Sequence, residues 1–321
     1  MSTDPINVYL PYLRKRVTEQ DLRILAGKIA ILAPEITLRG IDVENPPPWL
    51  LAPPLRKSFT FTLNVTRAAK LMADVPGPKY TARGISKPKQ LKRLEKAGVR
   101  VPATAPFSEA LAPDPDQFSP YLFVKTTAPG SSRARGIVFL RTEEFPARAA
   151  EIAAQFAEDI AAGYIPLVQA HVPTGLHPTH VRVLTFFGHP LMVYRTTAPA
   201  PFDPEKLADT AEGAATSNAS DRRDRRLEND PEITTFGAHA AAAAFPETPV
   251  MGMDILRHVD TGELYCIEAN VGNTAPLSAP VTRSLRDDLG TEAMLAQFGA
   301  YDVIAEEVVR RARAEAHGRV V

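Results

Sequence analysis

Two carboxylates and a carboxamide near the end of the sequence have the types and spacing of a metal site. Apolar runs at 250–256 and 263–268 flank Asp260-Thr261-Gly262, whose glycine supplies the positive φ that a three-residue hairpin loop needs. With that loop, Asp254 lies opposite Glu268 and on the same face of the hairpin. Asn270 follows Glu268 by two positions, so its side chain points the same way. Three oxygen donors therefore converge on one spot.

Oxygen donors of this kind suit Mg²⁺ or Mn²⁺. Two opposed carboxylates repel each other, and burying them without a partner adds the large cost of a buried ion. A divalent cation relieves both penalties, and Mg²⁺ commonly takes one or two carboxylates while water and nucleotide phosphates fill its remaining positions. The alternative is an edge hairpin whose acids face solvent, so the rest of the chain has to decide.

The composition sets limits on partners and compartment. The chain has 321 residues, enough for two or three lobes, and its 37 Lys and Arg balance its 37 Asp and Glu. No global field therefore recruits nucleic acid or an anionic membrane. The single cysteine, Cys266, excludes internal disulfides and a cysteine metal cluster and indicates a reducing compartment. With no signal-like start and no apolar run near membrane length, we expect a cytoplasmic protein.

Periodicity predicts an alternation of strands and helices that positions these donors. Strand-like runs at 6–10 and 29–32 flank a helical piece at 18–25, which suggests a small α/β lobe. Ser86 is the predicted N-cap of a helix that ends before Gly98. The remaining strands are predicted at 121–125, 137–140, 164–172, 181–187 and 190–195, and the remaining helices at 142–162, 231–245 and 291–316.

Two irregular segments carry charge. Residues 126–136 lie between two predicted strands, are rich in small and polar residues, and contain Gly130 and Gly136. Such a loop can lay backbone N–H groups against phosphate oxygens, and the alternative is a plain mobile hairpin loop. The run Asp221-Arg222-Arg223-Asp224-Arg225-Arg226 is typical of a solvated loop.

The order of these parts resembles the ATP-grasp superfamily, and within it the glutathione synthetase and ribosomal-protein glutamate ligase type. The resemblance covers residues 64–295, and the first 60 residues are not matched. It implies an α+β, ATP-grasp fold in which two α+β lobes clamp a nucleotide, preceded by a small N-terminal α/β lobe. The implied limits are 1–75 for the N-terminal lobe, 76–170 for the small ATP-grasp lobe with the phosphate loop, and 171–321 for the large lobe with the metal site and the C-terminal helix.

The resemblance assigns the nucleotide phosphates to lysines and to the glycine loop. Ser86-Lys87, followed by a helix and Ala97-Gly98-Val99-Arg100-Val101-Pro102, is similar to the family's Asp-Lys, helix, Ala-Gly-Ile-Pro stretch and implies Lys87 as the first phosphate lysine, with Lys79 as a competitor. Val124-Lys125 is similar to the family's Val-Lys-Pro strand end, which implies a phosphate contact for Lys125. The loop that folds over the phosphates is implied to include Gly130, Ser131 and Ser132.

The adenine contact is implied for the strand that joins the lobes. Leu167 to Val172 is similar to that strand, which implies contacts from Gln169, Ala170, His171 and Val172. Gln169 stands where glutamate is more usual, and a carboxamide can still accept from the adenine amino group. Three histidines, His171, His177 and His180, would suit a transition metal instead, but a histidine packed near the base explains His171 without a metal.

Two arginines and an asparagine are implied at the reacting end of the cleft. His180-Val181-Arg182-Val183 is similar to the family's Asp-Ile-Arg-Val, with His180 in place of the acid that often contacts ribose. Arg182 and Arg195 match arginines that face the phosphates or the acyl phosphate, a task that suits a guanidinium fork. Asn218 matches an Asn-Leu-His-Arg-Gly-Gly-like segment, although arginines stand where glycines are common.

The resemblance implies that Asp254, Glu268 and Asn270 are the family's metal ligands, which agrees with the hairpin register. It implies an ATP- and Mg²⁺-dependent (or Mn²⁺-dependent) ligase that joins a carboxylate, through an acyl phosphate, to an amine or similar nucleophile and releases ADP. The expected partners are small-molecule carboxylate and amine substrates, including amino acids or peptides, with no nucleic acid and no membrane, and the family pattern suggests a homodimer. The alternatives are a kinase of the same fold and a nucleotide-binding regulator without turnover.

Overall fold

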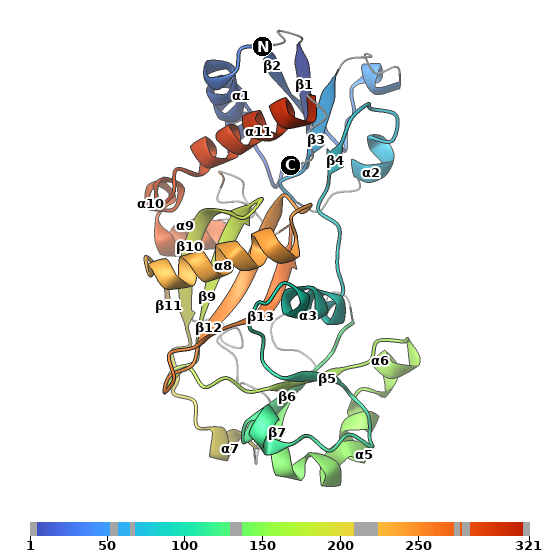
Figure 1. Ribbon diagram of the computed structural model, residues 1–321, viewed down its shortest axis with the longest axis vertical. Helices are drawn as coiled ribbons and strands as arrows, with labels where there is room; N and C mark the ends of the chain where they lie inside the picture. Colours follow the sequence, from blue (N-terminus) through green and yellow to red (C-terminus); the bar gives the residue numbers. More distant parts are fainter. Residues whose placement is uncertain are drawn as a thin grey trace.

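The computed structural model describes residues 5–51, 57–64, 68–128, 137–208, 224–272, 277 and 283–316. In these ranges the chain forms three sheets, which follow one another along the long axis of the molecule (Figure 1). We call them the N-terminal sheet, the large sheet and the small sheet. No helix in the same ranges has both the length and the apolar character needed to cross a bilayer.

The N-terminal sheet is parallel and has the strand order β2-β1-β3-β4. Its strands are β1 (Ile6–Tyr12), β2 (Ile36–Asp42), β3 (Ser58–Phe61) and β4 (Lys79–Tyr80), and η1 (Pro48–Leu51) and α2 (Ala68–Leu71) lie between them. Helix α1 (Glu19–Leu32) begins with a capping box between Thr18 and Asp21. The strand predicted at 29–32 is wrong, because Leu25 and Ile29 face the core one turn apart while Ile31 is 84% exposed.

The C-terminal helix packs on the N-terminal sheet. Helix α11 (Ala300–Ala316) lies beside α1 in Figure 1, and Ile304 and Val308 are fully buried in the core shared with β1 and β3. The single helix predicted at 291–316 is in fact two, α10 (Thr291–Ala296) and α11, after a short α9 (Arg283–Leu289). Gly299, with φ +64°, turns the chain between them.

The large sheet is antiparallel and has the strand order β11-β10-β9-β12-β13. Its strands are β9 (Thr179–Phe186), β10 (His189–Thr197), β11 (Asp224–Leu227), β12 (Val250–Arg257) and β13 (Leu264–Val271). Helix α8 (Pro231–Ala244) covers one face, and α3 (Lys87–Lys96) lies beside β13 (Figure 1). The prediction of a loop at 221–226 is wrong from Asp224 onward, because Asp224 to Leu227 pair with β10 as an edge strand, whereas 221–223 lie outside the described residues.

The hairpin of β12 and β13 pairs Asp254 with Glu268, so that prediction is confirmed. The three-residue loop is wrong, because His258 N–H donates to the Glu263 carbonyl at 2.9 Å and four residues, 259–262, lie between them. A β-bulge at Ile267 then adds one residue to β13. The two offsets cancel, and the carboxylates meet as expected.

The small sheet is antiparallel and has the strand order β5-β8-β6-β7. Its strands are β5 (Thr104–Pro106), β6 (Tyr121–Lys125), β7 (Ile137–Arg141) and β8 (Leu167–Ala170), with α4 (Pro115–Phe118), η2 (Thr142–Glu144) and α7 (Pro204–Ala208) at its margins. The helix predicted at 142–162 is divided at Phe156 into α5 (Phe145–Gln155) and α6 (Ala157–Ala161). Its apolar stripe of Phe145, Ala149 and Ile152 covers one face of the sheet as expected.

Several elements cross the limits that were predicted for the three lobes. Strand β4 belongs to the N-terminal sheet, and α3 packs its Leu91 and Leu94 into the core of the large sheet. The predicted lobe limits at 75 and 170 therefore stay a prediction. The packing instead assigns β4 to the N-terminal sheet and α3 to the core of the large sheet.

Gly237 in α8 makes the closest approach between that helix and the large sheet, and we expect Gly237→Ala to destabilise the protein. A Cβ there would lie 2.6 Å from the Val183 Cβ, so the helix has to move away from β9. The overpacking should outweigh the gain in helix propensity and lower the free energy of unfolding by about 1–3 kcal/mol. Chemical denaturation measures the change. Gly27→Ala in α1 is the control, because nothing lies within 4 Å of its added Cβ, and it should be neutral or stabilising.

Candidate functional site

The predicted site lies on the face of the large sheet that α8 does not cover. Met253 and Ile255 are buried in the core beneath α8, so Asp254 between them points to the other face. Arg182 of β9 is the cross-strand neighbour of Asp254 and shares this face. His180 lies two residues before Arg182 on the same strand, is buried, and also belongs to this face.

Asp254 is held by a bidentate ion pair with Arg182. Arg182 Nε and Nη2 donate to the two carboxylate oxygens of Asp254 at 2.6 Å each, and Asn270 Nδ2 donates to Oδ2 at 3.1 Å. The two side chains are 19% and 5% exposed. Burial on its own would raise the pKa of Asp254, but the Arg182 charge and hydrogen bonds outweigh it, and the pKa lies below its ordinary value.

Glu268 is the accessible carboxylate of the cross-strand pair. Its side chain is 35% exposed, and Oε1 lies 3.6 Å from Lys87 Nζ. Lys87 is the first residue of α3, so the start of that helix points to the carboxylates. Lys79 lies instead in β4 of the N-terminal sheet and is exposed. The structure brings Lys87, and not its competitor, to this face.

Lys125, at the end of β6, reaches the same place from the small sheet. Burial, and after it the charge of Lys87, lower the pKa of its ammonium, whereas Glu268 and Asp254 raise it, and the resulting pKa is about 8. All four groups are therefore close enough to influence one another. Lys125 Nζ donates to Gln169 Oε1 at 2.8 Å and lies 4.9 Å from the centre of the Phe123 ring.

Gln169 is part of a hydrogen-bonded chain that fixes Lys125. Gln169 Nε2 donates to Thr104 Oγ1 at 3.1 Å, and the Thr104 hydroxyl donates to the Pro102 carbonyl at 2.8 Å. Lysine has only donors, so the carboxamide oxygen must face it, and both ends of Gln169 are used inside the protein. The structure thus gives Gln169 a different contact from the adenine amino group expected from the sequence.

Residues 170–172 follow Gln169 at the edge of the small sheet. The N–H of Ala170 donates to the Ala103 carbonyl at 2.8 Å, and the N–H of His171 donates to the Tyr121 carbonyl at 2.9 Å. Both N–H groups therefore pair within the small sheet, and the adenine contacts expected from residues 170–172 stay a prediction. Val172 is buried where the chain leaves the sheet.

His171 sits among aromatic rings. Four lie within 6.5 Å of its ring centre, those of Tyr121, Phe123, Phe139 and Phe202. Burial, Lys125 and His258 together lower the pKa of His171 to about 4, so the ring is neutral at pH 7. Within the described ranges, no group of three His, Cys, Asp or Glu side chains is arranged to hold a metal, and the structure gives no support to a site of His171, His177 and His180.

Arg195 is not brought to the site. It pairs with Val181 across the sheet, which places it on the α8 face, and its Nε donates to Glu228 Oε2 at 2.6 Å. The remaining predicted residues, Asn218 and the loop residues Gly130, Ser131 and Ser132, lie outside the described residues.

The donor set fits a hard divalent cation. The carboxylate oxygens of Asp254 and Glu268 and the side-chain carboxamide oxygen of Asn270 are oxygen types that Mg²⁺ binds. Arg182 occupies both oxygens of Asp254 and Lys87 approaches Glu268, so cationic side chains supply the charge that these acids need. A metal bound here would compete with Arg182 for the Asp254 oxygens, whereas the Glu268 carboxylate is accessible to it.

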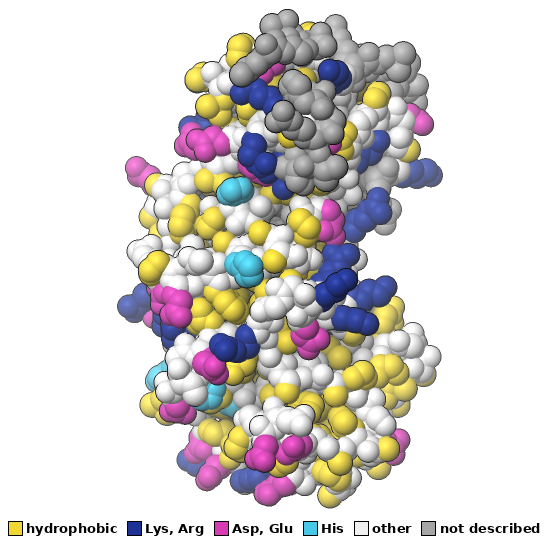
Figure 2. Space-filling view, in the orientation of Figure 1, with side chains coloured by type: hydrophobic (Ala, Val, Ile, Leu, Met, Phe, Trp, Pro, Cys, Tyr) yellow, Lys and Arg dark blue, Asp and Glu magenta, His cyan; other side chains and the backbone are white. Residues whose placement is uncertain are grey.

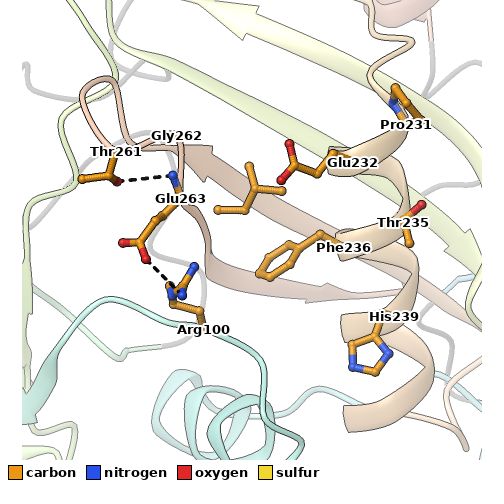
Figure 3. Close-up of a pocket in the computed structure, with 10 residues that line it drawn as sticks. Arg100, Pro231, Glu232, Thr235, Phe236, His239, Thr261, Gly262 and Glu263 are labelled. Atoms are coloured by element: carbon orange, nitrogen blue, oxygen red, sulfur yellow. Dashed lines mark hydrogen bonds and ion pairs between the residues drawn. The ribbon is translucent and has the colours of Figure 1, made fainter.

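A cavity of about 760 Å³ lies on the opposite side of the large sheet, and none of the predicted site residues that the structure describes is among those that line it. Figure 3 shows Phe236 of α8 pointing toward the hairpin, with the Arg100–Glu263 ion pair on the facing wall. His239 and Thr235 line the helix side. This cavity is separate from the face that carries Asp254.

Thr104 and Pro102 extend the chain of hydrogen bonds that begins at Lys125, although their sequence context assigns them no such contact. Gln169 pairs with Thr104 between β5 and β8. Thr104 and Gln169 are more than sixty positions apart in the chain. No local pattern in one sequence indicates such a pairing.

We expect nucleotide affinity to fall as the pH rises through about 8. Lys125 is charged below this pKa and neutral above it, and only the charged form attracts phosphate. The free energy of unfolding should rise over the interval from pH 8 to 10.5, because the unfolded chain binds the extra proton there. Titration calorimetry with ATP at several pH values measures the first effect. In Gln169→Glu a carboxylate faces Lys125, so the midpoint should move to higher pH, whereas an unchanged midpoint would contradict the assignment.

Comparisons of the whole chain with known proteins identify solved structures of similar fold. No protein-family model and no curated protein matches the sequence. The chain is similar to the crystal structure of D-cycloserine synthetase DcsG, with a TM-score of 0.52 and 15% identity over 95% of this chain and 99% of that chain. It is also similar to the ATP-grasp ligase PsnB complexed with minimal precursor, with a TM-score of 0.49 and 13% identity over 96% and 99% of the two chains. The RimK domain protein ATP-grasp from Sphaerobacter thermophilus gives a TM-score of 0.49 and 15% identity over 94% and 99%.

Proposed function

Because the chain has the ATP-grasp fold, we propose that it is an ATP- and Mg²⁺-dependent ligase that joins a carboxylate to an amine and releases ADP. One observation carries the proposal: Lys87, Lys125 and Arg182 come from three separate elements to the same two carboxylates, Asp254 and Glu268. The similarity to a structure described as a synthetase also supports a ligase function.

The charges of this cluster suit a nucleotide triphosphate. Three cations face two carboxylates, so the described part of the site has an excess of positive charge. In that arrangement the acids keep the cations in place while no phosphate is bound. A polyphosphate would take the place of Glu268 beside Lys87 and would give Lys125, which is held by Gln169, an anionic partner.

The residues have distinct tasks in the proposed reaction. Lys87 and Lys125 would hold phosphate oxygens from opposite sides of the cleft, and the chain of Gln169 and Thr104 would keep the Lys125 ammonium at a fixed position. Arg182 would orient the transferring phosphoryl group or the substrate carboxylate through its fork. A bound Mg²⁺ would supply charge neutralisation at the phosphates. The γ-phosphoryl group of ATP would pass to the substrate carboxylate and ADP would leave. The amine would then attack the acyl carbon and displace phosphate, and its proton would pass to the released phosphate or to water as the amide bond forms.

Release of ADP that needs both a carboxylic acid and an amine tests the proposal. The assay screens amino acids and short peptides with ATP and Mg²⁺ and measures ADP by a coupled enzyme reaction. Hydroxylamine is then added in place of the amine. A hydroxamate product supports an activated acyl group. A stable phosphorylated product without hydroxamate would identify a kinase, and tight ATP binding without turnover in every mixture would identify a nucleotide-binding regulator.

A further inference from the structure

The segment that contains α3 is strongly basic in a chain that is neutral overall. Between Lys79 and Arg100 there are eight Lys and Arg and one acidic residue, Glu95, although the formal net charge of the whole chain is +0. Figure 2 shows these basic side chains gathered on one side of the molecule at the level of α3.

Helical geometry places four of these cations together. Gln90, Leu91 and Leu94 are buried against the large sheet, and Lys87 shares their side and reaches Glu268. At 3.6 residues per turn, the cations opposite this side fall within an arc of about 100°. We call this set the α3 basic face: Lys89, Lys92, Arg93 and Lys96, all exposed.

Contacts within the protein do not neutralise this face. Arg93 pairs with Glu247 at 2.6 Å, but within the described residues no carboxylate lies in ion-pair distance of Lys89, Lys92 or Lys96. Like charges three and four positions apart in a helix repel each other. Lys89 also lies near the N-terminal end of α3, where the helix dipole disfavours a cation, and no acidic residue occurs in that first turn. The helix dipole favours Arg93 and Lys96 in the last turn, but it does not explain Lys89 or Lys92.

We propose that the α3 basic face docks an extended acidic peptide segment. Lys89, Lys92 and Lys96 follow one another at about one helical turn, or about 5 Å. Alternate side chains on one side of an extended peptide are about 6.5 Å apart. An acid at every second position therefore meets successive lysines along the helix.

Two observations favour a peptide over nucleic acid. Single-stranded nucleic acid is usually held by aromatic side chains that stack on the bases, next to cations that contact the phosphates. The segment from Gly84 to Gly98 contains no Phe, Tyr, Trp or His. The rest of the chain adds no net positive field that would attract a long polyanion.

The position of α3 connects this face to the candidate site. The helix begins at Lys87, which lies beside Glu268 on the inner side of α3. A segment bound along the outer side therefore approaches the carboxylates only where it passes the N-terminal end of the helix. A peptide docked here could present a carboxylate of its own chain to the site. That last step rests on the proposed ligase function, whereas the docking itself does not.

Binding of a labelled peptide without nucleotide tests the docking. The probe is a fluorescein-labelled peptide of alternating glutamate and serine, and its control has glutamine in place of glutamate. Fluorescence anisotropy should show binding of the first peptide only, weakened by added salt. The variant K89E/K92E/K96E should bind it at least about tenfold more weakly, and K89Q/K92Q/K96Q should lie between.

Controls make the result specific to α3. The variant K15E/R23E/K70E changes the net charge by the same amount, at exposed positions of the N-terminal sheet region. It should bind the peptide like the unchanged protein. Circular dichroism checks that each variant is folded, and ATP binding should be unaffected in all of them. Equal binding by K89E/K92E/K96E, or equal binding of the glutamine peptide, would overturn the proposal. Tighter binding of an oligodeoxythymidylate of the same charge, lost in the same variant, would overturn it in favour of nucleic acid.

Discussion

Glu268→Gln is expected to lower turnover by about 10²–10³ and to leave the fold intact. The substitution keeps the size of the side chain and removes the accessible negative charge opposite Lys87. If Glu268 holds a divalent cation at the phosphates, a neutral amide binds it far more weakly. The measurement is the rate of ADP release at saturating ATP and Mg²⁺, together with the Mg²⁺ concentration that gives half of the maximum rate.

Glu263→Gln is the matched control for this prediction. Glu263 lies in the same hairpin but pairs with Arg100 at 3.0 Å, away from the Asp254 face. Its loss should change turnover less than about threefold, as expected for an exposed ion pair. A Glu268→Gln enzyme with unchanged turnover would exclude Glu268 as a metal ligand, whatever the result of the control.

Arg182→Leu is expected to lower the free energy of unfolding by about 3–5 kcal/mol. The substitution leaves Asp254 buried without its bidentate partner, while the Asn270 amide still donates to it. Denaturation with urea at pH 7 in the presence of EDTA measures the loss without interference from divalent metal. The double variant Arg182→Leu/Asp254→Leu removes both charges and should recover much of the stability.

The pH dependence separates this mechanism from simple loss of packing. In the unchanged protein the pKa of Asp254 is lowered, so its stabilising contribution is present above the ordinary value near 3.8 and is lost as the pH falls through the lower folded value. In Arg182→Leu the isolated carboxylate should instead take up a proton on folding. Its deficit should therefore shrink between pH 7 and 4, and a deficit that does not change with pH would contradict a charge-based cause.

The sequence contained enough information for the carboxylate pair and for the two lysines that approach it. Asp254 and Glu268 are recognisable because the hairpin is local, and a turn signal and alternation decide most of the register. The agreement is partly coincidental, because the longer loop and the bulge at Ile267 shift the pairing register by one residue in opposite directions. The alternation of apolar and polar residues predicts neither shift.

Arg195 shows how far one extra residue can move a side chain. A bulge at Leu191 shifts the pairing between β9 and β10 by one position, so that Arg195 pairs with Val181. Without it Arg195 would pair with His180 and share the face of Arg182. Gln169 shows a different limit, since its contact with Thr104 depends on two strands that are distant in the sequence.

The packing of α11 on α1 and β1 has a consequence for how the chain folds. The core beneath the N-terminal sheet is completed by Ile304 and Val308, which are made almost three hundred residues after β1. During synthesis that apolar surface stays open until the last helix has left the ribosome. The many long-range contacts imply slow folding, and the first lobe becomes stable only when the rest of the chain is present. We therefore expect the early strands to be exposed to aggregation while translation continues.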